Sequence, residues 1–403
     1  MSHGPDNSTV NSKKRLAVFS IFPAQNMRTW FDFLRRHSHK YHVTYICPDF
    51  SRFGLRAEDY PAMRIVEYGK PGTGWKKKVP SRILMWFRFL RIKRELNASG
   101  PFDLLMLHGL YKPEMCLKVL DICQAFKKVL FIWNTTNYLC ENSKNTADSG
   151  VLSSVFTMVD GIYFGQNPNM NRFVSVWPRY ASKAQKHTWG LPSEFCDLSL
   201  SSATPLSEEL LSRVEDEEIL VFWARSINVR NRHDLLLETL KLASATWPEH
   251  IWARTRFILI TGVGADARTM KILKAFEKAQ FSNVHISHGE YFQKEWLMPF
   301  YDRADIWLNL SDTDQMTSGF YEACARKARV IMSDIVEYQH LPSMGFRVDL
   351  VKNDAAVVSE VLRKRVEEAL SGEPSRDMDV NREIIQRDFN ADINLEKIIQ
   401  SAI

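Results

Sequence analysis

Short apolar segments alternate with longer segments of helical composition along most of the chain. Candidate strands in the first half are residues 15–19, 41–47, 62–68, 103–108, 128–133 and 161–164, and candidate helices are 27–37, 82–96 and 113–126. Most of these strands are continuously apolar, which is typical of parallel strands covered by helices on both faces. The alternation therefore predicts an α/β fold with doubly wound, Rossmann-like sheets.

The same pattern resumes in the second half, and the chain is long enough for two cores. Its 403 residues indicate two domains of roughly 150–200 residues each. A stretch rich in Gly, Pro and Ser, about 188–209, separates the two halves and is typical of a linker. We expect a disordered N-terminus, a first domain, a linker, a second domain and a final helix, with boundaries at 1–14, 15–190, 191–209, 210–381 and 382–403.

Composition limits the cellular setting. The chain is 45% hydrophobic and 25% charged, with a formal net charge of +6, which is ordinary for a globular protein. Its six cysteines lack the spacing of metal ligands, so we expect reduced thiols and no metal site. The polar first fourteen residues do not resemble a signal peptide, and no apolar run of about 18 residues occurs. These features predict a cytoplasmic protein.

The stretch 304–338 carries the clearest candidate site. An apolar strand, 306–310, is followed by a polar loop and by a helix that starts near Thr317, Ser318 and Gly319. Such a helix start offers free backbone N–H groups and the positive end of a dipole to an anion such as a diphosphate.

Two carboxylates, Asp314 and Glu322, flank this helix start. Because acids would repel a phosphate, we expect them to bind hydroxyl groups through charge-assisted hydrogen bonds. A ligand with a central diphosphate and sugars on both sides fits this arrangement, and a nucleotide-sugar is such a ligand. The alternative is that Asp314 is an ordinary loop residue and Glu322 lies on a solvated helix face.

Two further loops follow strands upstream. Arg225 and Arg230 come after the candidate strand 219–223, where guanidinium groups are suited to bind a diphosphate bidentately. Gly262 and Gly264 lie between a strand and a helix, a place where backbone often approaches phosphate closely. Each pattern by itself is also common in surface loops.

His108 ends the candidate strand 103–108. Ligands of doubly wound sheets bind beyond the carboxyl ends of strands, so this imidazole is a candidate to face a cleft. A structural role for the ring is an equally good interpretation.

In this order, the features of the C-terminal half resemble retaining glycosyltransferases of the GT-B fold, the family 4 or group 1 type. The resemblance lies in Arg225 with Arg230 five positions on, a Gly-x-Gly loop, a turn at 289–292, and an acid followed by seven residues and Glu322. It covers about residues 219–350. In the first half it is one of architecture only.

The resemblance implies roles for single residues. Glu322 would hold the ribose hydroxyls and Asp314 the hydroxyls of the transferred sugar. The diphosphate would lie against both arginines and the helix start, and His108 would line the donor sugar. The remaining donor-binding residues would be Gly262, Gly264, Tyr291, Thr317, Ser318 and Gly319.

The resemblance also implies a reaction. A hexose would move from a UDP- or GDP-sugar to a glycan or lipid-linked saccharide with retention, without a metal or a further cofactor. The first domain would take the acceptor, the second the donor, and the final helix would cross back to the first domain. Asp314 stands where the family has Glu and is one methylene shorter. The residues Ser20-Ile21-Phe22-Pro23 replace a Gly-Gly loop.

The stretch 75–94 combines a basic cluster with an aromatic helix. This composition is typical of a segment that lies in an anionic membrane interface. The alternatives are a helix packed on the sheet with a basic solvent face and, less favoured, a nucleic-acid groove, because no nucleic-acid-binding motif accompanies it. A further alternative for the whole chain is a catalytically silent GT-B subunit that binds or scaffolds.

Overall fold

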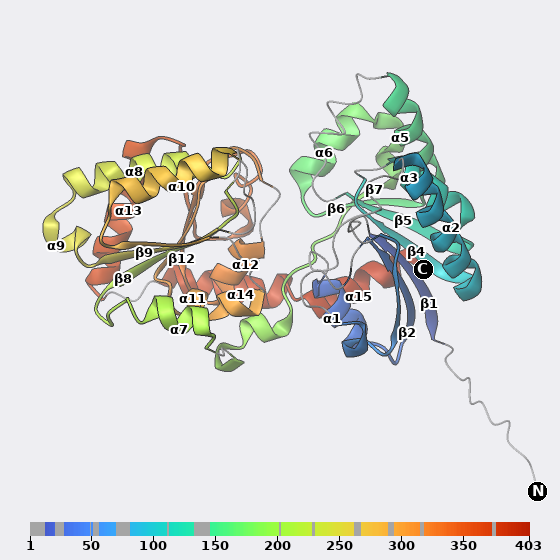
Figure 1. Cartoon of the computed structure of the whole chain (residues 1–403), viewed down its shortest axis with the longest axis horizontal. Coiled ribbons are helices and arrows are strands. Elements are labelled where there is room, and N and C mark those ends of the chain that lie inside the picture. The colour runs from blue at the N-terminus through green and yellow to red at the C-terminus, as the bar shows by residue number, and fades with distance from the viewer. Residues whose placement is uncertain are drawn as a thin grey trace, which may run out of the picture. The chain divides into compact units, whose positions relative to one another are not determined.

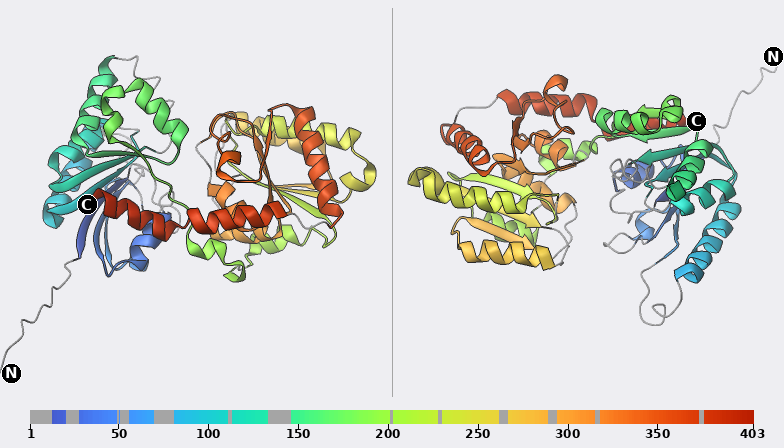
Figure 2. Two further views of the ribbon diagram at one scale, coloured as in Figure 1. Left: turned by 180° about the vertical axis from the view of Figure 1, so that it is seen from behind. Right: turned by 90° about the horizontal axis from the view of Figure 1, so that it is seen from above.

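The computed structural model of the chain describes residues 13–20, 28–48, 50, 56–69, 81–110, 113–132, 146–200, 203–227, 230–261, 267–288, 294–314, 318–372 and 376–403. These residues form two compact units. Unit 1 holds the residues up to Thr188 together with Leu395–Ile403, and unit 2 holds Trp189–Asn394. In each unit, helices cover both faces of a central sheet (Figure 1; Figure 2).

The described strands of unit 1 form a parallel seven-stranded sheet in the order β3-β2-β1-β4-β5-β6-β7. The strands are β1 Lys14–Ser20, β2 Tyr41–Cys47, β3 Met63–Glu67, β4 Phe102–His108, β5 Ala125–Ile132, β6 Gly161–Phe164 and β7 Ala184–Lys186. Strand order reverses between β1 and β4, where Ser20 lies beside His108 at the carboxyl edge.

Helices cover both faces of this sheet. They are α1 Arg28–Arg36, α2 Ser81–Ser99, α3 Pro113–Ile122, α5 Thr146–Met158 and α6 Asn167–Val176, with short helices Ala57–Asp59 and Pro178–Lys183. One core takes Ile92 of α2, Val119 of α3 and Val155 of α5. On α1, the ring of Phe31 lies 4.2 Å from that of Tyr45, centroid to centroid.

The described strands of unit 2 form a parallel six-stranded sheet in the order β10-β9-β8-β11-β12-β13. They are β8 Ile219–Ala224, β9 Thr255–Thr261, β10 Val284–His288, β11 Ile306–Asn309, β12 Arg329–Ser333 and β13 Asp349–Val351. Successive residues of β8 alternate between two cores: Leu220 and Phe222 face one, and Val221 and Trp223 face the other. A strand buried on both faces explains its continuous apolar sequence.

Two layers of helices supply the other halves of these cores. The helices are α7 Pro205–Leu211, α8 His233–Thr246, α9 Glu249–Trp252, α10 Ala267–Ala279, α11 Lys294–Arg303, α12 Ser318–Ala325, α13 Ala355–Leu370 and α14 Arg376–Asp388, with short helices Ser193–Cys196, Leu198–Leu200 and Pro342–Met344. Helices α11, α12 and α14 pack on the Phe222 side, and α8 and α13 pack on the Val221 side.

The segment expected as a linker is packed within unit 2. Leu191 and Phe195 are buried in the same core as Phe389. The Leu191 N–H donates to the Phe389 carbonyl over 2.8 Å, and the Ala391 N–H donates to the Leu191 carbonyl over 2.8 Å. Gly190 permits this close approach of the backbone to Phe389.

The segment expected as one final helix, 382–403, contains two helices, α14 and α15 Ala391–Ala402. The break lies at Phe389 and Asn390, where Asn390 Oδ1 accepts hydrogen bonds from the N–H groups of Asp392 and Ile393. A side-chain cap of this kind starts a new helix. In unit 1, Glu396 of α15 accepts hydrogen bonds from Tyr41 over 2.9 Å and Lys40 over 3.2 Å.

The described residues bear on the cysteines and on membrane-spanning segments. None of the five described cysteines forms a disulfide. Among the described residues, no helix is both long and apolar enough to cross a bilayer.

Candidate functional site

The centre of the unit 2 sheet places two loops side by side. The strand order reverses between β8 and β11, and ligands of doubly wound sheets bind at such a switch point, beyond the carboxyl ends of the strands. Arg225 directly follows β8, and residues 310–314 follow β11. The predicted arginine and acid therefore come from the two strands that flank the switch point.

Asp314 lies in a hydrogen-bonded network at this place. Its Oδ2 accepts from Arg225 Nη2 over 2.8 Å and from the Tyr338 hydroxyl over 2.5 Å. Asn309 Nδ2 donates to the Tyr338 hydroxyl over 3.0 Å, and Arg225 Nη2 also donates to Asn231 Oδ1 over 3.0 Å. The side chains of Arg225 and Asp314 are 18% and 12% exposed, so this ion pair is largely shielded from water.

The sequence predicts separate roles for Arg225 at phosphate and Asp314 at sugar, and the structure instead joins the two side chains. Burial, and then the charge of Asp314, raises the pKa of Tyr338 well above its usual value. The tyrosine is therefore a stable hydrogen-bond donor that fixes the direction of the carboxylate.

The loop that carries both arginines is tied to the loop that carries Asp314. Asn231 and Ser311 form an antiparallel bridge. The Asp312 N–H donates to the Arg230 carbonyl over 2.9 Å, and Arg232 Nη1 donates to Asp312 Oδ1 over 2.9 Å. Arg230 itself is exposed to solvent. The two loops thus form one preorganised rim.

Glu322 is buried on α12, with 2% of its surface exposed. It accepts a hydrogen bond from the hydroxyl of Tyr301 on α11. Burial, and then the charge of Glu322, raises the pKa of Tyr301 well above its usual value. A solvated helix face is therefore excluded for Glu322. Burying a carboxylate costs free energy, and such groups are retained where they meet a partner or a ligand.

The start of α12 is close-packed. Gly319 is buried and Ser318 is half-buried at the first positions of the helix. Arg326 anchors the other end, with its Nη1 donating to Asp302 Oδ1 of α11 over 2.7 Å. The helix is therefore held firmly against α11, with its N-terminus following the β11 loop.

His108 belongs to unit 1 and is fully buried at the end of β4. Its ring stacks on Phe131 with centroids 4.4 Å apart, and Trp30 of α1 packs edge-on at 5.3 Å. Burial lowers its pKa to about 3, so the imidazole is neutral at pH 7. Of the two interpretations of this residue, the structural role fits better, because aromatic side chains enclose the ring.

Four predicted site residues, Gly262, Gly264, Tyr291 and Thr317, lie outside the described residues. Next to the first pair, Thr261 Oγ1 and His288 Nδ1 are 2.8 Å apart at the carboxyl ends of β9 and β10. Among the described residues, no three His, Cys, Asp or Glu side chains cluster so as to hold a metal ion.

Sequence reasoning missed the residues that position the acids: Tyr338, Asn309, Asn231 and Tyr301. Asn309 carried a signal, since it is the one polar side chain in the apolar run 306–310. The two tyrosines carried none, because each lies on a neighbouring element and meets its carboxylate only in the folded unit.

Comparisons with known proteins agree with this topology. No protein-family model and no curated protein sequence matches the chain. A sucrose-phosphate synthase from Thermosynechococcus elongatus aligns with a TM-score of 0.72 at 15% identity, over 96% of this chain and 99% of that one. Anabaena HepE, in complex with UDP and glucose, aligns with a TM-score of 0.69 at 11% identity, over 96% and 99%. The chain has the GT-B fold.

A third structure with this GT-B fold is a UDP-forming trehalose-phosphate synthase from Burkholderia xenovorans. It aligns with a TM-score of 0.69 at 12% identity, over 96% of this chain and 98% of that one. At such identities the likeness establishes the fold. The predicted fold class, two Rossmann-like domains of the GT-B type, is confirmed.

Proposed function

We propose that the chain is a glycosyltransferase that moves a sugar from a UDP- or GDP-sugar to a glycan or lipid-linked saccharide. The observation that carries the proposal is the Arg225–Asp314–Tyr338 network at the switch point of unit 2. Asp314 shortly precedes the start of α12 in the sequence. Support comes from the GT-B neighbours, of which HepE was solved with UDP and glucose.

In this proposal the donor lies across the carboxyl edge of unit 2. Glu322 binds the ribose hydroxyls, and Arg230, with the Ser318–Gly319 helix start, binds the diphosphate. Asp314 binds hydroxyls of the transferred sugar, with Tyr338 fixing its direction. Arg225 has two roles: it positions Asp314 and places positive charge beside the diphosphate.

The reaction proceeds with retention and without a metal. The bond from the anomeric carbon to the diphosphate oxygen breaks, and the bond to the acceptor oxygen forms on the same face. The acceptor proton passes to the leaving phosphate oxygen. Negative charge that develops on the diphosphate is stabilised by the arginines and by the α12 dipole, which is electrostatic rather than general-base catalysis.

The test is a transfer and hydrolysis assay over a panel of UDP- and GDP-sugars, with wild type, Glu322→Gln and Glu360→Gln. Glu360 is an exposed glutamate on α13 and serves as the matched control. We expect turnover by wild type and by Glu360→Gln, and a loss of about a hundredfold in Glu322→Gln. Equal, negligible turnover in all three with nucleotide-sugar binding retained would favour a silent subunit. No binding and no turnover by the wild type would overturn the donor site.

A second partner is supported by α2, which has two different faces. Ile92 and Leu96 are buried in the unit 1 core, whereas Trp86 and Phe87 are 56% and 59% exposed. The exposed cations Arg91, Lys93 and Arg94 follow on the same helix. We propose that this face meets an anionic membrane surface at the cytoplasmic side, which would bring unit 1 to a lipid-linked acceptor. The basic residues Lys76, Lys77 and Lys78 lie outside the described residues.

A further inference from the structure

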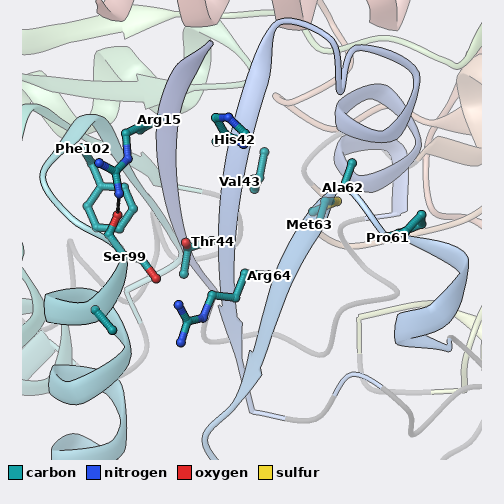
Figure 3. Close-up of a pocket in the computed structure, with 11 residues that line it drawn as sticks. Arg15, His42, Val43, Thr44, Pro61, Ala62, Met63, Arg64, Ser99 and Phe102 are labelled. Carbon is teal, nitrogen blue, oxygen red and sulfur yellow. Dashed lines mark hydrogen bonds between the residues drawn. The ribbon is translucent and has the colours of Figure 1, made fainter. Parts of the chain in front are cut away.

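A pocket opens at the amino-terminal edge of the unit 1 sheet, with a volume of about 640 Å³ (Figure 3). Its walls come from the first residues of β1, β2, β3 and β4 and from the last turn of α2. Strand β1 has seven residues, so the carboxyl edge, where ligands of doubly wound sheets bind, lies roughly 20 Å away at about 3.3 Å per residue. The pocket is therefore separate from the switch point of its own sheet.

The lining of the pocket combines cationic, hydroxyl and apolar groups. Arg15, His42 and Arg64 supply nitrogen donors, Thr44 and Ser99 supply hydroxyls, and Phe102 supplies part of an apolar wall. Among the described residues that line the pocket, none is a carboxylate. Figure 3 shows Arg64, Thr44 and Ser99 around one side of the opening.

Ser99 carries the strongest sign of a missing ligand. The residue is 8% exposed, and its Oγ is buried without a hydrogen-bond partner among the described residues. Its backbone carbonyl, in contrast, accepts from the Arg15 guanidinium at the end of α2. A buried hydroxyl without a partner costs free energy, and a polar ligand in the pocket would remove that cost.

The pocket residue Arg64 is held in place but keeps hydrogen-bond donors available. Arg64 Nη2 donates to Glu95 Oε2 over 2.5 Å, and Arg94 shares the same carboxylate. A guanidinium has five N–H donors in a planar fork, so one such contact orients the group and leaves others for a ligand. Because two arginines share one glutamate, this trio keeps a net positive charge.

We propose that this pocket binds a small organic phosphate. The phosphate contacts Arg64, Arg15 and the Ser99 hydroxyl, and a sugar-sized remainder contacts Thr44 and Phe102. Arginine suits a phosphate because the fork can donate two parallel hydrogen bonds. A volume of about 640 Å³ is in the range of pockets for small ligands. This proposal stands independently of the proposed transferase activity.

The test is isothermal titration of the full chain with ribose 5-phosphate, with ribose and inorganic phosphate as comparison ligands. We expect one ribose 5-phosphate per chain, weaker binding of phosphate and none of ribose. Arg64→Ala weakens binding about tenfold or more. The matched control, Arg56→Ala, changes nothing, because Arg56 lies outside the pocket in unit 1 and pairs with Asp59.

Ser99→Ala separates a binding role from a structural one. Because its hydroxyl has no partner within the described part of unit 1, we expect unchanged or higher thermal stability together with several-fold weaker binding. Absence of binding to the wild type would overturn the proposal, as would binding that Arg64→Ala and Ser99→Ala leave intact. Binding lost in Arg230→Ala but kept in Arg64→Ala would instead assign the ligand to the donor site.

Discussion

At the scale of single residues, the contacts of Asp314 show how this site holds an Asp, which is one methylene shorter than the Glu expected at its position. Two donors hold its Oδ2, the Arg225 guanidinium and the Tyr338 hydroxyl, and Tyr338 is in turn held by Asn309. The carboxylate therefore has one orientation before any ligand arrives, which is the preorganisation that electrostatic catalysis requires.

Tyr338→Phe removes one of these donors and keeps the ring. We expect kcat/KM for sugar transfer to fall about tenfold to a hundredfold, because hydrogen bonds to charged groups contribute roughly 1.5–3 kcal/mol. Steady-state kinetics measures this. The control is Tyr180→Phe, which removes a hydroxyl bonded to Ser153 in unit 1 and should lower stability without changing transfer. Equal losses of activity in both variants would contradict the role of Tyr338.

His108 gives a pH prediction. Its folded pKa of about 3 lies below the usual 6.5, so the unfolded chain binds its proton first as the pH falls. The neutral ring stabilises the fold at pH 7, and this contribution is lost below about pH 6.5. We expect wild type to lose about 2 kcal/mol relative to His108→Phe between pH 7.5 and pH 5.

Urea unfolding at several pH values, followed by a probe in unit 1, measures this difference. His39→Asn, at an exposed histidine of the same unit, should follow the wild-type pH dependence. A pH dependence in His108→Phe identical to that of wild type would contradict the buried neutral ring.

At the scale of elements, the junction between α14 and α15 depends on one close backbone contact. Gly190 has φ +88°, and a Cβ there would lie 2.0 Å from the carbonyl oxygen of Phe389. The glycine lets the Leu191 segment pair with the chain between the two helices. The glycine that contributed to the linker prediction is therefore explained by packing.

Gly190→Ala should destabilise unit 2 severely, by roughly 3 kcal/mol or more, since backbone strain adds to a clash with main-chain atoms. Gly372→Ala is the matched control: its φ is also positive, at +71°, but a Cβ there would have no atom within 4 Å. We expect about 1 kcal/mol for this variant. Thermal unfolding of both variants measures the difference, and similar losses would show that φ alone is responsible.

At the scale of the whole molecule, both units use the same topology, with strand order reversing once in each sheet. The topology places Ser20 and His108 at the switch point of unit 1, and Arg225 and Asp314 at that of unit 2. Different chemistry follows from the same arrangement: an aromatic cluster encloses the first site, and polar groups surround the second.

The proposed contact of α2 with a membrane can be tested at the exposed residues Trp86 and Phe87. Replacing Trp86 and Phe87 together by Ser should reduce co-sedimentation with phosphatidylserine vesicles about tenfold or more, because two aromatic side chains lose their burial in the interface. Phe126→Ser is the control, since Phe126 is 78% exposed elsewhere in unit 1. Salt-dependent binding to DNA without vesicle binding would instead favour a nucleic-acid partner.

Much of the architecture could be predicted because apolar strands and intervening helices are local patterns. The middle residues of the central strands β1, β4, β8 and β11 are continuously apolar since both faces are buried. The edge strands β7 and β13 were missed: each has only three residues, too few to show a strand pattern, so pairing with a neighbour decides them.

The sequence by itself determined the α/β class and the order of the candidate site features along the chain. It also determined the candidates Arg225, Asp314 and Glu322, because these residues follow a strand or lie in the first turns of a helix. Only the tertiary structure decided that Asp314 pairs with Arg225 and Tyr338, that Glu322 is buried against Tyr301, and that His108 is enclosed. The physical reason is distance along the chain. Arg225 and Asp314 are 89 residues apart, and no local pattern encodes a contact that the pairing of β8 with β11 creates.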